Sequence, residues 1–138
     1  MAFDQTLTTS FKQDILLGVH DLETDVIKMA LFLATADLGA ATTEYSTTGE
    51  TSGTGYTPGG EILMSVTVLT ADTTAYVDFA DPSWDPAAFT ARGALIYNAS
   101  KSNKAIAVLD FGADKTATTT FTVQMPANTA TSALIRIS

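Results

Sequence analysis

The sequence predicts a mainly β protein, an antiparallel β-sandwich or barrel of about seven strands with one short N-terminal helix and a long polar loop. Three observations lead to this prediction. Short apolar stretches separated by turn-forming residues recur from Glu61 to the end of the chain. Threonine, whose branched Cβ favours strands, is frequent throughout. Helix start and stop signals occur together only near the N-terminus.

The length of 138 residues fits one domain, 1–138, which can bury about two-thirds of the surface that its unfolded form exposes. Three parts are expected within it. They are an N-terminal helical segment, 1–24, a polar loop or arm, 40–60, and a β core, 61–138. No internal repeat divides the chain further.

The N-terminal helix is expected at 9–17. Thr9 or Ser10 can accept a hydrogen bond from the first free amides, and Gly18 provides the stop. The next stretch, 25–38, carries apolar side chains that suit an extended strand, although its Ala and Leu content leaves a helix open. We interpret it as a strand.

The 40–60 segment has almost no apolar side chains and many Thr, Ser and Gly. Such a composition does not supply a core, so the segment is expected to be a long loop or an extended arm. Long loops in compact domains are commonly either mobile or functional. An arm of this kind could become ordered when it binds a neighbouring protein.

The β core begins at 61–69, where apolar and polar residues alternate with the period of two that marks a strand. A turn at 71–73 leads to a short strand at 75–79, which Asp81 and Pro82 end. These two stretches predict a pair of neighbouring strands.

Two further strands are expected at 89–98 and 105–111, joined by a polar turn at 99–103. Their almost continuous apolar character indicates strands covered on both faces, by a second sheet or by another subunit. Alternation returns at 116–125, and a last strand is expected at 133–137.

The formal charge of −8 repels phosphate backbones, so nucleic acid is not expected as a partner. The charge is uneven, with 13 acids and 2 bases in residues 1–91 but 2 acids and 5 bases in residues 92–138. One explanation is a soluble acidic domain with scattered bases. The other is an oligomer in which the basic C-terminal part of one copy, which includes Arg136, meets the acidic surface of another.

The chain contains no Cys, which excludes disulfides, thiolate metal sites and Cys nucleophiles. The N-terminal residues lack a basic region followed by an apolar stretch, and about 18 consecutive apolar residues occur nowhere. We therefore expect no membrane association and synthesis in a cytoplasm.

His20 is the only histidine, so a Ser-His-acid relay would need it, with Asp21 or Asp14 as the orienting carboxylate. No G-x-S-x-G motif accompanies it, and one imidazole does not make a zinc site. We predict no enzyme, no cofactor and no metal site. A calcium ion remains an alternative to ordinary turn formation for four aspartates, Asp72, Asp78, Asp81 and Asp85.

Trp84 lies between two Asp-Pro pairs, which would fix its position in a loop. A tryptophan held in this way can fill the end of a sandwich core or an interface, and it can also stack on a sugar together with tyrosines such as Tyr45 and Tyr56. Arg92, beside a strand glycine, can pair with an acid across a sheet or a subunit boundary. We name five candidate interface residues, Trp84, Arg92, Tyr45, Tyr56 and Arg136.

The stretch 83–112 reads SWDPAAFTARGALIYNASKSNKAIAVLDFG, a Trp loop followed by two apolar strands around a polar turn. This pattern, over about residues 89–125, resembles small, head-associated structural proteins of tailed bacteriophages, which include decoration and cement proteins of the capsid. The resemblance implies a non-enzymatic virion protein that binds the major capsid protein on the head exterior as an oligomer, commonly a homotrimer, and stabilises the capsid. The alternative is a head-fibre or tail module that binds a host glycan or receptor.

Overall fold

The computed structural model describes residue 3 and residues 5–127 and 129–137. The protein is mainly β and sandwich-like, with one short helix and three antiparallel sheets in the described part. The order in the large sheet is β1-β8-β7-β2-β3, in the small sheet β10-β5-β4, and in the third β6-β9. The elements are β1 (Thr6–Leu7), α1 (Thr9–Leu16), β2 (Ile27–Phe32), β3 (Glu61–Ile62), β4 (Thr67–Ala71), β5 (Thr74–Asp78), β6 (Ser83–Trp84), β7 (Phe89–Asn98), β8 (Lys104–Ala117), β9 (Phe121–Thr122) and β10 (Arg136–Ile137).

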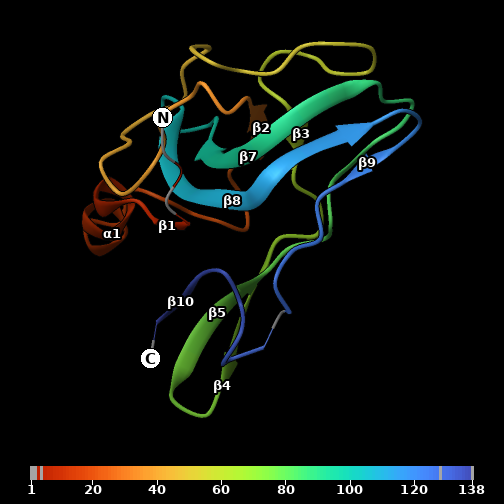
Figure 1. Ribbon diagram of the computed structural model, residues 1–138. Helices are drawn as coiled ribbons and strands as arrows, with labels where there is room; N and C mark the ends of the chain where they lie inside the picture. Colours follow the sequence, from red (N-terminus) through yellow and green to blue (C-terminus); the bar gives the residue numbers. More distant parts are fainter. Residues whose placement is uncertain (1–2, 4, 128, 138) are drawn as a thin grey trace.

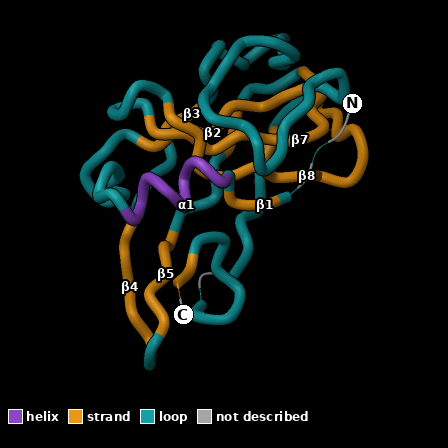
Figure 2. The backbone as a smooth tube through the Cα atoms, turned by 90° about the vertical axis from the view of Figure 1, so that its left-hand side faces the viewer, coloured by secondary structure: helices purple, strands orange, loops and turns teal. Residues whose placement is uncertain are grey.

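The large sheet forms the main body, and the small sheet projects from it as a β4–β5 hairpin joined by the C-terminal strand (Figure 1). Helix α1 lies on one side of the body, on the same side as the C-terminus. Figure 2 views the molecule from that side, with β4 and β5 extending away below the helix. The two sheets therefore meet near α1.

Helix α1 ends at Leu16 with Gly18 in the left-handed region at φ 72°, as the sequence predicts. The capping residue is Thr8, one residue before the predicted cap. Its side-chain oxygen accepts a hydrogen bond from the Phe11 amide at 3.2 Å. Thr8 takes this role because its own amide is fixed to the Ile106 carbonyl of β8 at 2.9 Å.

β2, β7 and the first part of β8, residues 105–109, are almost completely buried, which confirms that both faces of these apolar stretches are covered. Residues 112–116 in the second half of β8 are exposed. One face packs against α1 and an aromatic cluster that includes Tyr56 and Trp84. The other face packs against the segment that follows β2, including Leu38 and Tyr45. The cover comes from the helix, the loops and the other strands of the same chain.

The predicted strand at 61–69 is two strands in different sheets. β3 pairs with β2 in the large sheet, and β4 pairs with β5 in the small sheet. Between them the backbone turns at Ser65, whose φ is 55°. The alternation of apolar and polar residues in the sequence runs across this turn and does not reveal it.

The predicted strand at 116–125 is also different in the structure. β8 continues to Ala117, paired with the beginning of β7 at Phe89, and only the short β9 follows. β9 pairs with β6, which the sequence did not predict. The predicted strands at 89–98 and 75–79 correspond closely to β7 and β5, and the last strand is limited to β10.

The 40–60 segment is a loop, as predicted, but it is packed against the large sheet and is not a free arm. Isolated bridges join Glu50 to Phe32, Glu44 to Lys104 and Thr54 to Ala88. Within it Thr51 and Tyr56 are buried. Of the two alternatives expected for this segment, a loop or an extended arm, the structure shows the loop, because a few of its side chains and backbone groups fix it at several points.

Candidate interaction surfaces

Trp84 is a core residue with only 1% of its surface exposed. Its indole lies among the rings of Tyr56, Phe89 and Phe121, with centroids 6.1–6.4 Å away. This position fits the expectation that Trp84 fills the end of the core. A sugar-stacking platform needs an exposed ring face, and the described fold offers none at Trp84.

Tyr45 and Tyr56 meet at the carboxylate of Glu50. The Tyr45 hydroxyl donates to Glu50 Oε1 at 2.6 Å, and the Tyr56 hydroxyl donates to Oε2 at 2.5 Å. The Gly59 amide also donates to Oε2, at 2.8 Å. Glu50 thus holds three parts of the 40–60 segment together, and we name this group the Glu50 cluster.

The Glu50 cluster continues into the large sheet. The Tyr56 hydroxyl accepts from the Leu31 amide of β2 at 2.9 Å, and the Tyr97 hydroxyl of β7 donates to the Gly59 carbonyl at 2.7 Å. Burial and, for Tyr45 and Tyr56, the hydrogen bond to Glu50 raise the pKa of these phenols, and burial raises that of Tyr97 to about 12. All three tyrosines therefore remain neutral donors at physiological pH, and their role is to anchor the loop.

Arg92 lies on β7 and pairs with Asp110 of β8, with Nε 3.3 Å from Oδ1. The pairing register of the two strands shifts between Ala91 and Gly93. Arg92 therefore has a partner within its own chain, and both side chains remain about one-third exposed.

Arg136, the fifth candidate, borders an apolar depression on the surface. This depression, which we name the α1 groove, lies between α1 and the small sheet and has a volume of about 710 Å³. Its apolar lining comes from both sides of this junction, with Leu7, Phe11, Ile15 and Leu16 on one side and Val68, Val77, Ile135 and Ile137 on the other.

Large apolar side chains are exposed around the α1 groove. Leu16 is 86% exposed and Ile137 59%, although both line the groove. Leu17 follows on the chain and is also exposed. Apolar side chains held in contact with water at a formed groove are typical of a surface that binds another molecule.

Two basic side chains lie at the α1 groove. Lys12 and Arg136 line it with a single acid, Asp21, and His20 is the only other titratable group there besides Tyr76. Within the described residues neither Lys12 nor Arg136 takes part in an ion pair. The groove therefore offers two basic side chains to an acidic partner group.

The outer edge of the small sheet is partly occupied. β4 is an edge strand, and its pairing with β5 directs the amides of Val68 and Thr70 outward. The Glu23 carboxylate accepts a hydrogen bond from the Val68 amide at 2.9 Å. A charged group at an edge strand opposes the addition of another strand. Contacts at this end of the molecule therefore favour the side chains of the groove over the backbone of β4.

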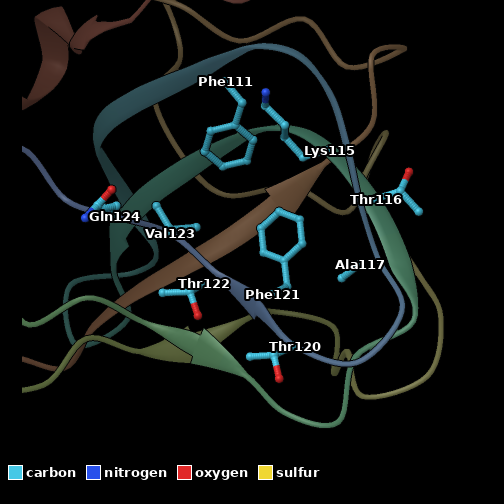
Figure 3. Close-up of a pocket in the computed structure, with 9 residues that line it drawn as sticks. All are labelled: Phe111, Lys115, Thr116, Ala117, Thr120, Phe121, Thr122, Val123 and Gln124. Atoms are coloured by element: carbon cyan, nitrogen blue, oxygen red, sulfur yellow. The ribbon is translucent and has the colours of Figure 1, made fainter.

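A second, smaller pocket lies between the far half of β8 and the strand β9 (Figure 3). Its volume is about 350 Å³, and its lining combines the rings of Phe111 and Phe121 with Lys115, Gln124 and several threonines. The two rings point toward each other with centroids 6.1 Å apart. Mutual packing of the rings accounts for this arrangement, since Phe121 is almost fully buried.

His20 belongs to a buried polar group below α1. Its Nδ1 lies 3.0 Å from Asn98 Nδ2, which also donates to Asp25 at 2.8 Å. Lys101 donates to both oxygens of Asp25 at 2.7–2.8 Å. Burial lowers the pKa of His20, although Asp14 and Asp25 oppose the effect. Neutral His20 accepts from Asn98, so this group joins the end of β7 to the segments on either side of Leu22.

No group of three or more His, Asp or Glu side chains in the described part is arranged to hold a metal ion. The four aspartates considered for calcium do not converge there. Across the same residues no helix is long and apolar enough to span a membrane. Comparisons of this chain with models of protein families, with curated proteins and with solved structures found no match.

Sequence reasoning identified Arg136 but missed the rest of the α1 groove. The groove combines residues from the N-terminal helix, the β4–β5 hairpin and the C-terminus, which lie far apart in the sequence. A signal was present in the pair Leu16-Leu17, because two adjacent leucines at the end of a short helix cannot both face the core. Glu50 was not singled out either.

Proposed function

We propose that this chain is a non-enzymatic structural protein of a tailed-phage particle, a decoration protein that binds the assembled head shell as an oligomer. The proposal combines the resemblance of residues 89–125 to such proteins with one observation on the fold. That observation is the exposed apolar surface around α1 and the small sheet.

The exposed apolar side chains are concentrated in a few segments. They are Leu16 and Leu17 after α1, Val26 before β2, Ile62 and Met64 near β3, Val68 and Leu69 on β4, and Ile137 on β10. A folded chain gains about 25 cal/mol for each Å² of such surface removed from water. Burial against other proteins of an assembled particle stabilises a surface of this kind.

The geometry supports a glycan-binding role less well. The expected platform used Trp84, which is buried, and Tyr45 and Tyr56, whose hydroxyls are bound to Glu50. Sugar recognition usually combines an exposed aromatic face with free polar groups. The groove offers an apolar lining with two cations instead, which suits protein side chains.

Counting the copies of the protein in purified particles tests the proposal. Gel densitometry against the major capsid protein should give a copy number that saturates the shell, and particles made without the protein should lose head stability on heating. A few copies per particle, intact heads and lost adsorption would favour the host-binding alternative. Particles that contain no copies at all would contradict both.

A further inference from the structure

We propose that the α1 groove binds a second copy of this chain through the 61–64 segment of that copy. The inference deepens the proposed function, on which it rests for the existence of an oligomer, by assigning the contact between its copies. Two surfaces of the same molecule carry matching chemistry.

The 61–64 segment presents apolar side chains beside an acid. Ile62 is 50% exposed and Met64 64% exposed, whereas Leu63 between them is buried. A hydrogen bond holds the segment to β2, because the Leu63 amide donates to the Ile27 carbonyl at 2.8 Å. The side chains of Ile62 and Met64, on either side of Leu63, face outward. Glu61 is exposed at the start of the segment and has no ion pair among the described residues.

The α1 groove has the complementary properties. Its floor is apolar, and its volume of about 710 Å³ lies within the range of about 300–1,000 Å³ that holds compact ligands. Lys12 and Arg136 are both exposed there, and neither forms an ion pair with another described residue. The apolar side chains of the 61–64 segment fit the floor, and Glu61 fits the two cations. Complementary charges at an interface fix the partner and the register more than the affinity.

The outer strands of the two sheets favour a contact between copies that is made through side chains. β3 ends the large sheet and β4 ends the small sheet, so the 61–64 segment lies in the connection between two sheet edges. The Glu23 carboxylate already accepts a hydrogen bond from the Val68 amide on β4. A copy that placed its 61–64 segment in the groove would leave this hydrogen bond in place, whereas strand addition to β4 would displace it.

The 61–64 segment and the α1 groove are different surfaces of one copy, so the copies can form two kinds of closed assembly. Two copies can exchange segments around a twofold axis, or each copy can pass its segment to the next around a ring. Both arrangements bury Ile62, Met64 and the groove floor, and both join Lys12 of one copy to Glu61 of another. A single charge reversal at either position therefore weakens the assembly in both cases.

A charge exchange tests the contact. The mass of the full chain would be measured by light scattering after gel filtration over a range of concentrations. We expect a defined oligomer for the original chain and a dissociation constant raised at least about tenfold in Lys12→Glu and in Glu61→Lys. The double variant Lys12→Glu/Glu61→Lys should regain most of the association, because the pair is restored with reversed signs.

Controls separate this contact from general charge effects and from misfolding. Lys115→Glu and Glu44→Lys reverse exposed charges outside the groove and should leave the mass unchanged. Circular dichroism should be unchanged in all variants, because every substituted side chain is exposed. Met64→Asp should weaken association without rescue by the charge exchange. An equimolar mixture of the two single variants should associate fully around a twofold axis but incompletely in a ring of three.

The inference is wrong if the single variants keep the mass of the original chain or if the double variant stays dissociated. It is also wrong if the original chain is monomeric at every concentration, or if Lys12→Glu alters only binding to head shells. In those cases the copy number on particles still decides the proposed function. Conversely, rescue in solution with no copies on particles would support the contact and contradict the phage role.

Discussion

Glu50 shows how one side chain determines the state of a whole polar segment. Its carboxylate accepts from two tyrosine hydroxyls and one backbone amide. A carboxylate with three donors compensates for the loss of water around each of them. One acid in a stretch of Thr, Ser and Gly therefore turns an expected arm into a fixed loop.

Replacing Glu50 with Ala should lower the free energy of unfolding by about 2–4 kcal/mol, since three donors lose a charged acceptor. Urea denaturation followed by the fluorescence of the buried Trp84 measures the change. Glu44→Ala, in the same segment but exposed, serves as the control and should change the value by less than about 0.5 kcal/mol. Equal effects of the two substitutions would mean that the Glu50 cluster does not hold the loop.

Asp25 contributes to the dependence of stability on pH in acid. Burial alone would raise its pKa, but hydrogen bonds from Lys101 and Asn98 outweigh burial and lower the pKa to about 2 from the ordinary 3.8. A group with a lowered pKa in the folded state contributes stability that is present above its unfolded pKa and lost as the pH falls through the folded one. This contribution therefore disappears between about pH 4 and pH 2.

In Asp25→Asn the free energy of unfolding should be lower at neutral pH, and its decrease from pH 4 to pH 2 should be smaller than in the original chain. Chemical denaturation at a series of pH values measures both. Asp114→Asn, at an exposed position on β8, is the comparison and should keep the original acid dependence. If the free energy of unfolding fell from pH 4 to pH 2 as steeply in Asp25→Asn as in the original chain, other carboxylates would govern the loss of stability in acid.

At the scale of elements, the close approach of the 40–60 loop to the large sheet depends on glycine. Gly60 precedes β3 and has φ 81°, and a Cβ there would lie 1.8 Å from the Met29 carbonyl oxygen of β2. Backbone cannot move aside cheaply in a buried strand. The entry of the chain into β3 thus requires the absence of a side chain at this position.

Gly60→Ala should lower the free energy of unfolding by about 3 kcal/mol or more, through overpacking added to left-handed strain. Gly112→Ala is the matched control. It has the same φ of 81° but nothing within 4 Å of a Cβ, so only the strain of about 1–2 kcal/mol applies. Thermal or urea unfolding compares the two, and similar losses would show that the loop can shift away from β2.

At the scale of the whole molecule, the two sheets share one core. Val77 and Ile135 of the small-sheet region belong to the same cluster of buried side chains as Phe11 and Ile27 of the main body. The projecting hairpin in Figure 1 is therefore attached by apolar packing as well as by the chain. A continuous core in a chain of this size favours unfolding in one step.

We expect unfolding transitions followed by Trp84 fluorescence and by far-ultraviolet circular dichroism to coincide. Ile135→Ala, which creates a cavity beneath the small sheet, should lower both midpoints equally and cost about 2–5 kcal/mol. A circular dichroism transition that precedes the fluorescence change would reveal that the small sheet unfolds by itself. The exposed Ile137→Ala provides the comparison with little loss of stability.

The sequence by itself determined the mainly β class, the helix before Gly18, the hairpin strand β5 and the buried strand β7. Each depends on neighbours in the chain, through a period of two, a turn or a stop signal. The same local signals placed the 40–60 segment correctly as a loop. They also showed that the central strands are covered on both faces.

Only the tertiary structure decided what covers those faces, because burial patterns reveal that a side chain is covered but not by which segment. It placed Trp84 in the core, fixed the loop through Glu50 and brought α1, β4 and β10 together around a groove. These arrangements depend on contacts between residues far apart in the chain. Their free energy comes from packing that no local pattern encodes.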